Sequence, residues 1–234
     1  MDLSTRTIKK EFLDSPGMDD ATLTEAYRFM AVVNRFFGGQ GVVEKFILRL
    51  SRRLKTQQLQ ILDLGSGGCD IPIAVRRWGL KKNIDLHFTC LEISDFACDL
   101  GLKNIKRSRL TGIELIKADI FSFRPVNKFD AVIGSMFFHH FTNDEIIQIA
   151  RIVHGFGPKS LLINDLSRTN INYFACVLAA LFLDPVVKHD ALTSIERGFT
   201  RPQLHSMLQE LTDAQITVQN RWFCRVMGTV EWDM

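Results

Sequence analysis

The sequence predicts an α/β protein with a doubly wound, mostly parallel sheet of seven strands, helices on both faces and an N-terminal helical cap. Short apolar runs alternate with segments of helical periodicity from residue 58 onward, the order typical of a parallel sheet. The first of these runs breaks into the glycine-rich turn Gly65-Ser66-Gly67-Gly68. Several of the runs also end in an acidic residue, and parallel strands end at one common edge of a sheet.

Composition narrows the class of protein. The chain of 234 residues is long enough for one domain with a full core, and its 46% hydrophobic and 24% charged residues are typical of a globular protein. A net charge of +3 is too small to indicate nucleic-acid binding. The five cysteines are scattered without a Cys-x-x-Cys pair, which indicates reduced thiols, no zinc site and a cytoplasmic location. We expect no metal, no signal peptide and no stable membrane insertion.

The first 58 residues carry helical patterning, and we expect them to form a cap on a domain spanning residues 59–234. Asp19-Asp20-Ala21-Thr22 is a capped start for a helix through about Phe37, and Gly38-Gly39 ends it. A second amphipathic helix is expected from Gly41 to about Leu54. Its basic face is interpreted as solvent-exposed surface.

The glycine turn follows a predicted strand at 60–64 and precedes a predicted helix at 70–79. Glycines let the backbone adopt positive φ and let a ligand approach the main chain, and the helix directs its free N–H groups at that ligand. A dinucleotide fingerprint needs a small residue where this chain has Asp70. Asp63 and Asp70 therefore disfavour a pyrophosphate and favour a ligand that carries a cation or an amine.

Two further acids stand at predicted strand ends. Glu92 ends the strand that begins at Asp85, and a carboxylate there can accept hydrogen bonds from both hydroxyls of a ribose. The alternative is an exposed strand-end carboxylate. After a helix over 95–106 and a strand over 113–118 comes Asp119, which on its own reads as a helix cap or turn residue.

A histidine pair follows the predicted fourth strand, residues 129–135, and precedes a helix at 143–154. His139 or His140 is a candidate general base, because imidazole titrates near neutrality; the alternative is that the pair only lines the pocket. The fifth strand, residues 160–166, ends in Asn164-Asp165-Leu166. Asp165 is predicted to bind substrate or to support a histidine.

The segment from Ile171 to Val187 is apolar but too short to span a bilayer. We interpret it as one helix that roofs the active site and favours an apolar or aromatic acceptor; a plain core helix is the alternative. Thr200 is a predicted N-cap of a helix over 202–211. Strands at 216–219 and 223–230 are expected to complete the sheet.

The apolar-Asp63-Leu64-Gly65-x-Gly67 pattern resembles the first motif of the class I S-adenosylmethionine-dependent methyltransferases, which have a Rossmann-like fold. That resemblance implies S-adenosyl-L-methionine as cofactor and S-adenosyl-L-homocysteine (SAH) as product. It places Asp63 near the amino-acid part of the cofactor, Glu92 at the ribose and Asp119 at the adenine. The implied cofactor-binding residues are Asp63, Gly65, Ser66, Gly67, Glu92, Ile93, Asp119, Ile120 and Ser135.

The segment from Asn164 to Thr200 is also similar to small-molecule methyltransferases of the quinone-biosynthesis type. This likeness implies methyl transfer to a small lipophilic or aromatic acceptor, with oxygen as the expected atom. His139, His140 and Asp165 are then the candidate catalytic residues.

Three alternatives share part of this pattern. An RNA or protein methyltransferase would share every cofactor motif, although the Asn/Asp-Pro-Pro-aromatic tetrad of amino-directed nucleic-acid enzymes is absent. An NAD(P)-dependent oxidoreductase would share the glycine turn, and a catalytically dead partner module would share the fold. The sequence leaves open whether the protein is a monomer or a homodimer.

Overall fold

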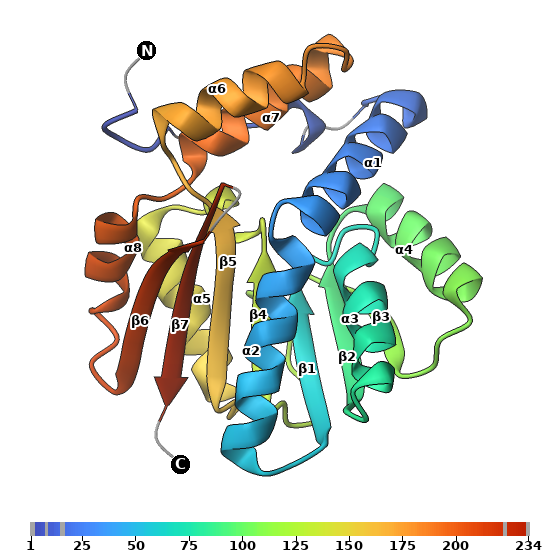
Figure 1. Ribbon diagram of the computed structural model, residues 1–234, viewed down its shortest axis with the longest axis vertical. Coiled ribbons are helices and arrows are strands. Elements are labelled where there is room, and N and C mark those ends of the chain that lie inside the picture. Colours follow the sequence, from blue (N-terminus) through green and yellow to red (C-terminus); the bar gives the residue numbers. More distant parts are fainter. Residues whose placement is uncertain (1–2, 8, 15–16, 222–223, 233–234) are drawn as a thin grey trace.

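One sheet of seven strands organises the computed structural model, which describes residues 3–7, 9–14, 17–221 and 224–232. The strand order is β3-β2-β1-β4-β5-β7-β6; β1 to β5 are parallel and β7 runs antiparallel to both of its neighbours (Figure 1). The predicted mostly parallel seven-stranded sheet is confirmed. The strands are β1 (Gln58–Leu64), β2 (Asp85–Glu92), β3 (Ile113–Lys117), β4 (Ala131–Ser135), β5 (Ser160–Leu166), β6 (Ala214–Arg221) and β7 (Arg225–Trp232).

Helices cover both faces of this sheet, as the sequence predicts. Ala131 and Ile133 of β4 face a core shared with α2 (Gly39–Leu54) and α3 (Asp70–Lys81), whereas Val132 faces a core shared with α5 (Asn143–Gly155) and α8 (Arg201–Leu208). This alternation is the period of two that a strand imposes on its side chains. A further helix, α4 (Asp95–Ser108), flanks β3.

Helix boundaries follow the capping residues in the sequence. Asp19 accepts hydrogen bonds from the N–H groups of Ala21 and Thr22 and begins α1 (Asp20–Phe36), and Gly38, with φ of +86°, separates α1 from α2. Thr200 accepts from the Gln203 N–H and begins α8, confirming that predicted cap. Phe223, the predicted start of the last strand, lies outside the described residues.

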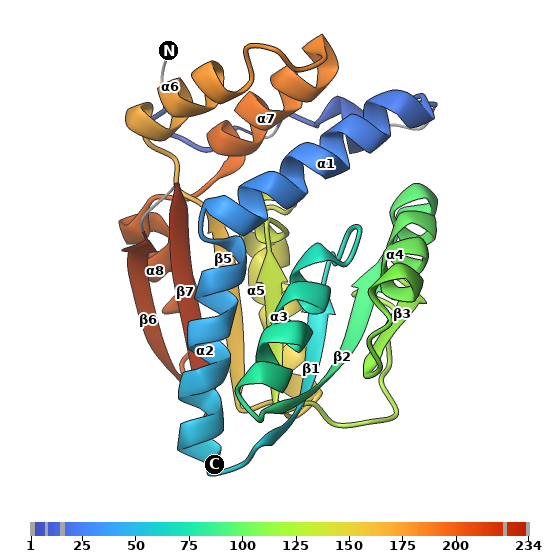
Figure 2. The ribbon, with the colours of Figure 1, turned by 45° about the vertical axis from the view of Figure 1, so that its right-hand side comes forward.

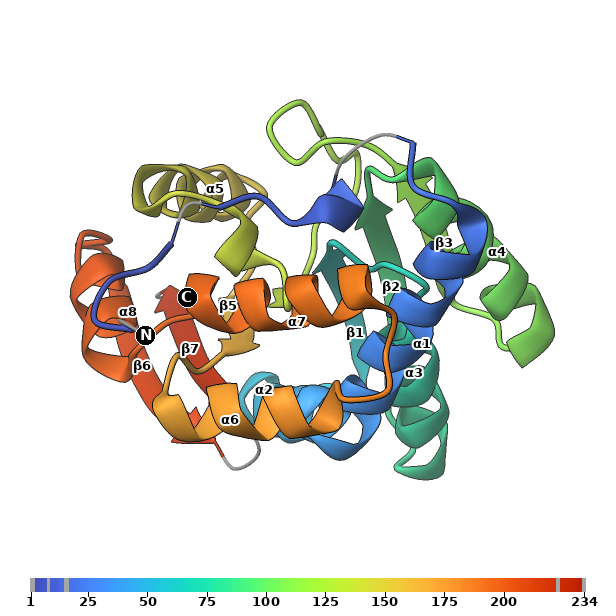
Figure 3. The ribbon, with the colours of Figure 1, turned by 90° about the horizontal axis from the view of Figure 1, so that it is seen from above.

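The prediction of one helix from Ile171 to Val187 is wrong. The segment forms two helices, α6 (Asn170–Ala179) and α7 (Pro185–Arg197). Asp184 accepts from the Val186 N–H and caps α7, and Pro185 occupies the first turn, where its missing N–H costs nothing. The two helices lie side by side and, with α1, form a layer above the carboxyl ends of the parallel strands (Figures 2 and 3).

The N-terminal strap, residues 3–7 and 9–14, runs along this roof and contains one 3-10 turn, η1 (Phe12–Asp14). Asp190 of α7 accepts hydrogen bonds from the N–H groups of Phe12 (2.9 Å) and Leu13 (2.7 Å), and the Phe12 ring stacks on His189. The strap is therefore fixed to α7. The division into a cap up to residue 58 and a domain from 59 stays a prediction, although α2 packs on the sheet.

No helix in the described part of the chain is long and apolar enough to cross a membrane.

Candidate active site

The glycine turn after β1 has the backbone that its sequence predicts. Gly65 and Gly67 have φ of +62° and +52°, values that L side chains rarely adopt. A Cβ on Gly65 would lie 2.4 Å from Cδ2 of Phe137, and one on Gly67 would lie 3.2 Å from Cε1 of Tyr27. The turn is thus enclosed by one ring from the tip of β4 and one ring from α1.

Glu92 joins the tip of β2 to this turn. Its Oε2 accepts from the N–H of Gly67 (2.8 Å), and its Oε1 accepts from those of Ile93 (2.8 Å) and Ser94 (2.9 Å). A carboxylate offers about four acceptor positions, so one position remains for an incoming hydroxyl. A second hydroxyl would have to displace one of these N–H groups.

Asp63 is a buried carboxyl whose ionisation a cationic ligand would favour. Burial, together with the nearby negative charges of Asp70 and Glu92, outweighs a hydrogen bond with Ser66 and raises the pKa of this carboxyl to about 8. The carboxyl is therefore mostly protonated at neutral pH, and a cation placed beside it would favour the ionised form. Such a site fits a ligand with an ammonium or sulfonium group and disfavours a pyrophosphate.

Asp70, the other acid at this turn, is linked through Asn34 to strand β7. The Asn34 Nδ2 donates to Asp70 Oδ2 (3.2 Å), and the Asn34 Oδ1 accepts from the buried Arg225 of β7 (2.9 Å). Arg225 also donates to the carbonyl oxygen of Phe37 (3.2 Å). This chain of contacts fixes α1 and its junction with α2 to the sheet beside the glycine turn.

The other predicted cofactor-binding residues differ in their exposure to solvent. Asp119 is exposed and its Oδ1 accepts from the Phe121 N–H (3.0 Å), as a turn residue does, while Ile120 is buried in the core. Ile93 is 63% exposed at the tip of β2. Ser135 is buried, and its Oγ accepts from Asn164 Nδ2 (3.0 Å). The structure thus brings Asp63, Glu92 and the glycines together, and leaves Asp119 and Ile93 open at the rim.

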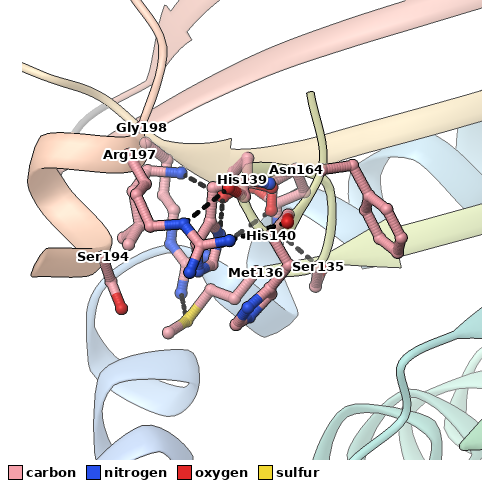
Figure 4. A network of polar contacts seen from close by, with 12 residues as sticks. Ser135, Met136, His139, His140, Asn164, Ser194, Arg197 and Gly198 are labelled. Carbon is pink, nitrogen blue, oxygen red and sulfur yellow. Dashed lines mark hydrogen bonds and ion pairs between the residues drawn. The ribbon is translucent and has the colours of Figure 1, made fainter. Parts of the chain in front are cut away.

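The histidine turn, η2 (Phe138–His140) at the tip of β4, is built around a buried ion-pair network (Figure 4). The Nδ1 of His139 lies 2.7 Å from Asp165 Oδ1, and the His139 backbone N–H donates to Asp165 Oδ2 (3.2 Å). On its other side, the His139 Nε2 lies 3.6 Å from Oε1 of Glu11 in the N-terminal strap. His139, Asp165 and Glu11 are all buried.

This arrangement sets the charge of His139. Burial alone would lower the pKa of the imidazole, but Asp165 and Glu11 outweigh it and raise that pKa to about 9. Burial opposes ionisation of both carboxyls, yet their contacts with His139 lower the pKa values of Asp165 and Glu11 to about 2. His139 is consequently protonated at neutral pH and cannot accept a proton there.

Two guanidinium groups hold the backbone of the histidine turn. Arg197 of α7 donates to the carbonyl oxygens of His139 (3.0 Å) and His140 (2.7 Å), as Figure 4 shows. Arg6 of the strap donates to the carbonyl oxygen of Phe141 (3.0 Å). The half-buried His140 ring packs 4.2 Å from that of His139. The roof and the strap therefore fix the backbone of the turn that carries the half-buried His140.

Ligand atoms of Glu11, His139 and His140 lie within 4.8 Å of one another, a spacing that could hold a metal ion. Arg197 opposes this, because its NH1 lies 3.8 Å from Glu11 Oε1, and the protonated His139 offers no lone pair. An ion-pair network accounts for the cluster better than a metal site does.

Sequence reasoning missed several residues of this site. Glu11, Arg6, Asn34 and Arg225 come from parts of the chain far from the strand tips, and no local motif marks them. Arg197 stands in the segment whose likeness to small-molecule methyltransferases is noted above, but its contact with the histidine turn could not be predicted from that likeness.

Comparison with known proteins agrees with this geometry. Residues 61–156, which include the glycine turn, Glu92, Asp119 and both histidines, match the family model of a methyltransferase domain. No curated protein matches the chain.

Solved structures share the fold at low sequence identity. The plantazolicin methyltransferase BpumL in complex with SAH has a TM-score of 0.73 at 13% identity, over 92% of this chain and 91% of that one. The magnesium protoporphyrin IX methyltransferase of Synechocystis PCC 6803, also with SAH, has a TM-score of 0.58 at 10% identity over 94% and 90%. A methyltransferase from Aquifex aeolicus has a TM-score of 0.56 at 12% identity over 75% and 82%.

Two acids at the strand tips fit S-adenosylmethionine: Glu92 has an acceptor position for a ribose hydroxyl, and Asp63 gains from a cation. Residues 61–156 thus match a methyltransferase domain, and the chain has the fold of solved methyltransferases that bind SAH.

Proposed function

We propose that this enzyme methylates a small lipophilic or aromatic acceptor at an oxygen atom. The observation that carries the proposal is the contact between the histidine turn and the glycine turn. Phe137, two residues before His139, packs directly on Gly65. An acceptor held by the histidine turn would therefore lie next to a cofactor held by the glycine turn.

The bound cofactor supplies an electrophilic methyl group on a sulfonium, so the protein mainly has to align the acceptor and exclude water. In this proposal Asp63 faces the cationic amino-acid part of the cofactor, and Gly65, Ser66 and Gly67 lie beneath it. Glu92 accepts from the ribose, with Ile93 beside it. Asp119, Ile120 and Ser135 complete the contacts, with Asp119 at the adenine.

His140 is the proposed general base, which removes the proton from an acceptor hydroxyl as the methyl group transfers. His139 is a positioning residue, because its Nδ1 faces the carboxylate of Asp165 and its Nε2 faces that of Glu11. Arg197 and Arg6 fix the turn so that the His140 ring keeps one orientation. Asp165 acts through His139, since it is fully buried behind it.

The sequence bases the expectation of an apolar acceptor on the segment from Ile171 to Val187, but the structure supports that expectation less there than at the histidine turn. Much of the apolar surface of α6 points outward, with Ile171 80%, Phe174 66% and Leu178 68% exposed. The better support is the aromatic cluster at the histidine turn, where the rings of Phe137 and Phe141 lie 4.8 Å apart. Fold neighbours include an enzyme crystallised with a triazolic desmethylPZN analog and a magnesium protoporphyrin IX methyltransferase, names that denote heteroaromatic ligands.

Two measurements test the proposal. Isothermal titration with SAH should show binding to the folded protein. Transfer of labelled methyl groups should then be detected with small phenols or quinols and should be absent with total RNA and with protein extracts. Methylation of RNA or protein with no transfer to any small hydroxyl compound would overturn the acceptor class while leaving the family intact.

A further inference from the structure

A cavity of about 360 Å³ lies between α2 and the β6–β7 edge of the sheet. Helix α2 crosses the front of the sheet and leaves the same face of β6 and β7 uncovered beside it (Figure 1). None of the proposed cofactor or acceptor residues lines this cavity. Its volume is within the range of small-molecule sites.

The floor of the cavity is apolar. Val42 and Phe46 from α2 and Met227 from β7 line it, and each is at least nine-tenths buried. Phe36, at the end of α1, forms an exposed rim, and the guanidinium of Arg35 lies 5.2 Å from the centre of its ring. An apolar body placed on this floor would be removed from water on one side by three side chains.

The walls of the cavity are cationic. Arg35 of α1, Lys45 and Arg49 of α2, and Arg221 of β6 line it, and no carboxylate is among the described lining residues. Arg49 forms an ion pair with Glu231, but the described part of the chain offers no ion pair to Arg35, Lys45 or Arg221. Three elements therefore bring uncompensated positive charge to one apolar hollow.

We propose that this cavity binds an amphiphilic anion. Its apolar body lies on Val42, Phe46 and Met227, and its sulfonate, phosphate or carboxylate group is held by Arg35, Lys45 and Arg221. Guanidinium groups bind such anions through paired N–H donors, and the positive potential also speeds the approach of the anion. Methyl transfer at the strand tips does not require this site, so the inference stands apart from the proposed function.

The test uses the full-length protein and 8-anilinonaphthalene-1-sulfonate, an anion with an aromatic body whose fluorescence rises in apolar surroundings. We expect saturable binding that weakens with added salt. The double variant Arg35→Gln/Arg221→Gln should weaken it at least about tenfold, since two charged hydrogen-bonding groups are lost. Lys103→Gln/Arg107→Gln on α4 removes the same net charge elsewhere and should leave affinity unchanged.

A second variant tests the cavity without altering its charge. A Cβ added at Gly41, which lines the cavity, would meet no atom within 4 Å, so Gly41→Leu can fold and fill the space. It should weaken dye binding, while SAH affinity, measured as a check of folding, stays unchanged.

The exposed apolar surface of α6 and of the turn that follows it is the competing dye site, and Phe174→Ser/Phe182→Ser removes its two exposed aromatic rings. The proposal holds if this variant binds the dye as the parent protein does. It is overturned if the Phe174→Ser/Phe182→Ser variant abolishes binding, or if the Arg35→Gln/Arg221→Gln variant binds within twofold of the parent.

Discussion

The glycine turn and the histidine turn end neighbouring strands, β1 and β4, yet their charges are arranged in opposite ways. At the glycine turn, backbone N–H groups contact Glu92, and the buried Asp63 has no cationic partner among its described contacts. At the histidine turn, His139 lies between two carboxylates, and Arg197 and Arg6 hold the backbone. In the free protein the buried acid of the first region is therefore without a compensating positive charge, whereas the charges of the second region are paired.

We therefore expect different roles for the two turns: the glycine turn binds the ligand, and the histidine turn positions a side chain. A site that gains its missing charge from the ligand couples affinity to pH, because the carboxyl must lose its proton when the cation arrives. A site whose charges are already paired gains little from a ligand and instead holds a neighbouring group, here His140, in one orientation. The predictions below test these two roles, from the largest expected effect to the smallest.

His140→Ala should lower the turnover number by about 100-fold, the lower range for loss of a general base, while SAH affinity stays within twofold. Single-turnover methyl transfer across pH 6–9 measures it. His87→Ala, which removes a half-exposed imidazole on β2, is the matched control and should keep full rate. Full rate in the His140→Ala variant at every pH would remove the base from the mechanism.

Asp165→Ala should reduce the free energy of unfolding by about 3 kcal/mol, because it leaves the His139 charge buried with one partner fewer. Urea denaturation at pH 6 measures the loss. Asp213→Ala breaks an exposed aspartate–histidine contact with His154 and should cost less than about 1 kcal/mol. Equal losses in the two variants would contradict the importance of the buried network.

The network also predicts a pH dependence of stability. The pKa of His139 is raised, so its contribution is complete below its ordinary value near 6.5 and is lost as pH rises through about 9. The pKa values of Glu11 and Asp165 are lowered, so their contributions are present above about pH 4 and are lost as pH falls through about 2. Thermal melting of the Glu11→Gln variant should show a weaker decline between pH 6.5 and 9 than the parent protein.

Much of this fold could be predicted because its signals are local. Asp19, Thr200 and the glycines mark their own element ends, and apolar runs mark the strands. Asp63 and Glu92 also stand at the strand tips where their sequence context places them, whereas their contact with a cofactor stays a prediction. Pro185 also marked the break between α6 and α7, but the apolar pattern continued across it and suggested one helix.

The histidine turn could not be predicted in the same way. Glu11 reaches His139 from the strap, which Asp190 and Ser194 of α7 hold, and Arg197 reaches the turn from α7. Such contacts depend on how distant elements pack, and no spacing in the sequence encodes them.

Glu92→Ala should weaken SAH binding by about 1–3 kcal/mol through the loss of charged hydrogen bonds. Because Glu92 also holds the Gly67 N–H, part of this loss is expected from a looser glycine turn. Isothermal titration gives the affinity, and Glu114→Ala on the neighbouring strand is the control. An unchanged affinity would separate Glu92 from the cofactor.

The central claim is that Asp63 completes a cradle for a cationic nucleoside, and the pH dependence of SAH affinity tests it most directly. Isothermal titration from pH 6 to 9 should show affinity rising up to about tenfold per pH unit and levelling off near pH 8, where the free carboxyl ionises. Asp63→Asn should bind more weakly at pH 8 and lose this dependence. Affinity that is independent of pH in the parent protein, or no binding by folded protein, would contradict the account.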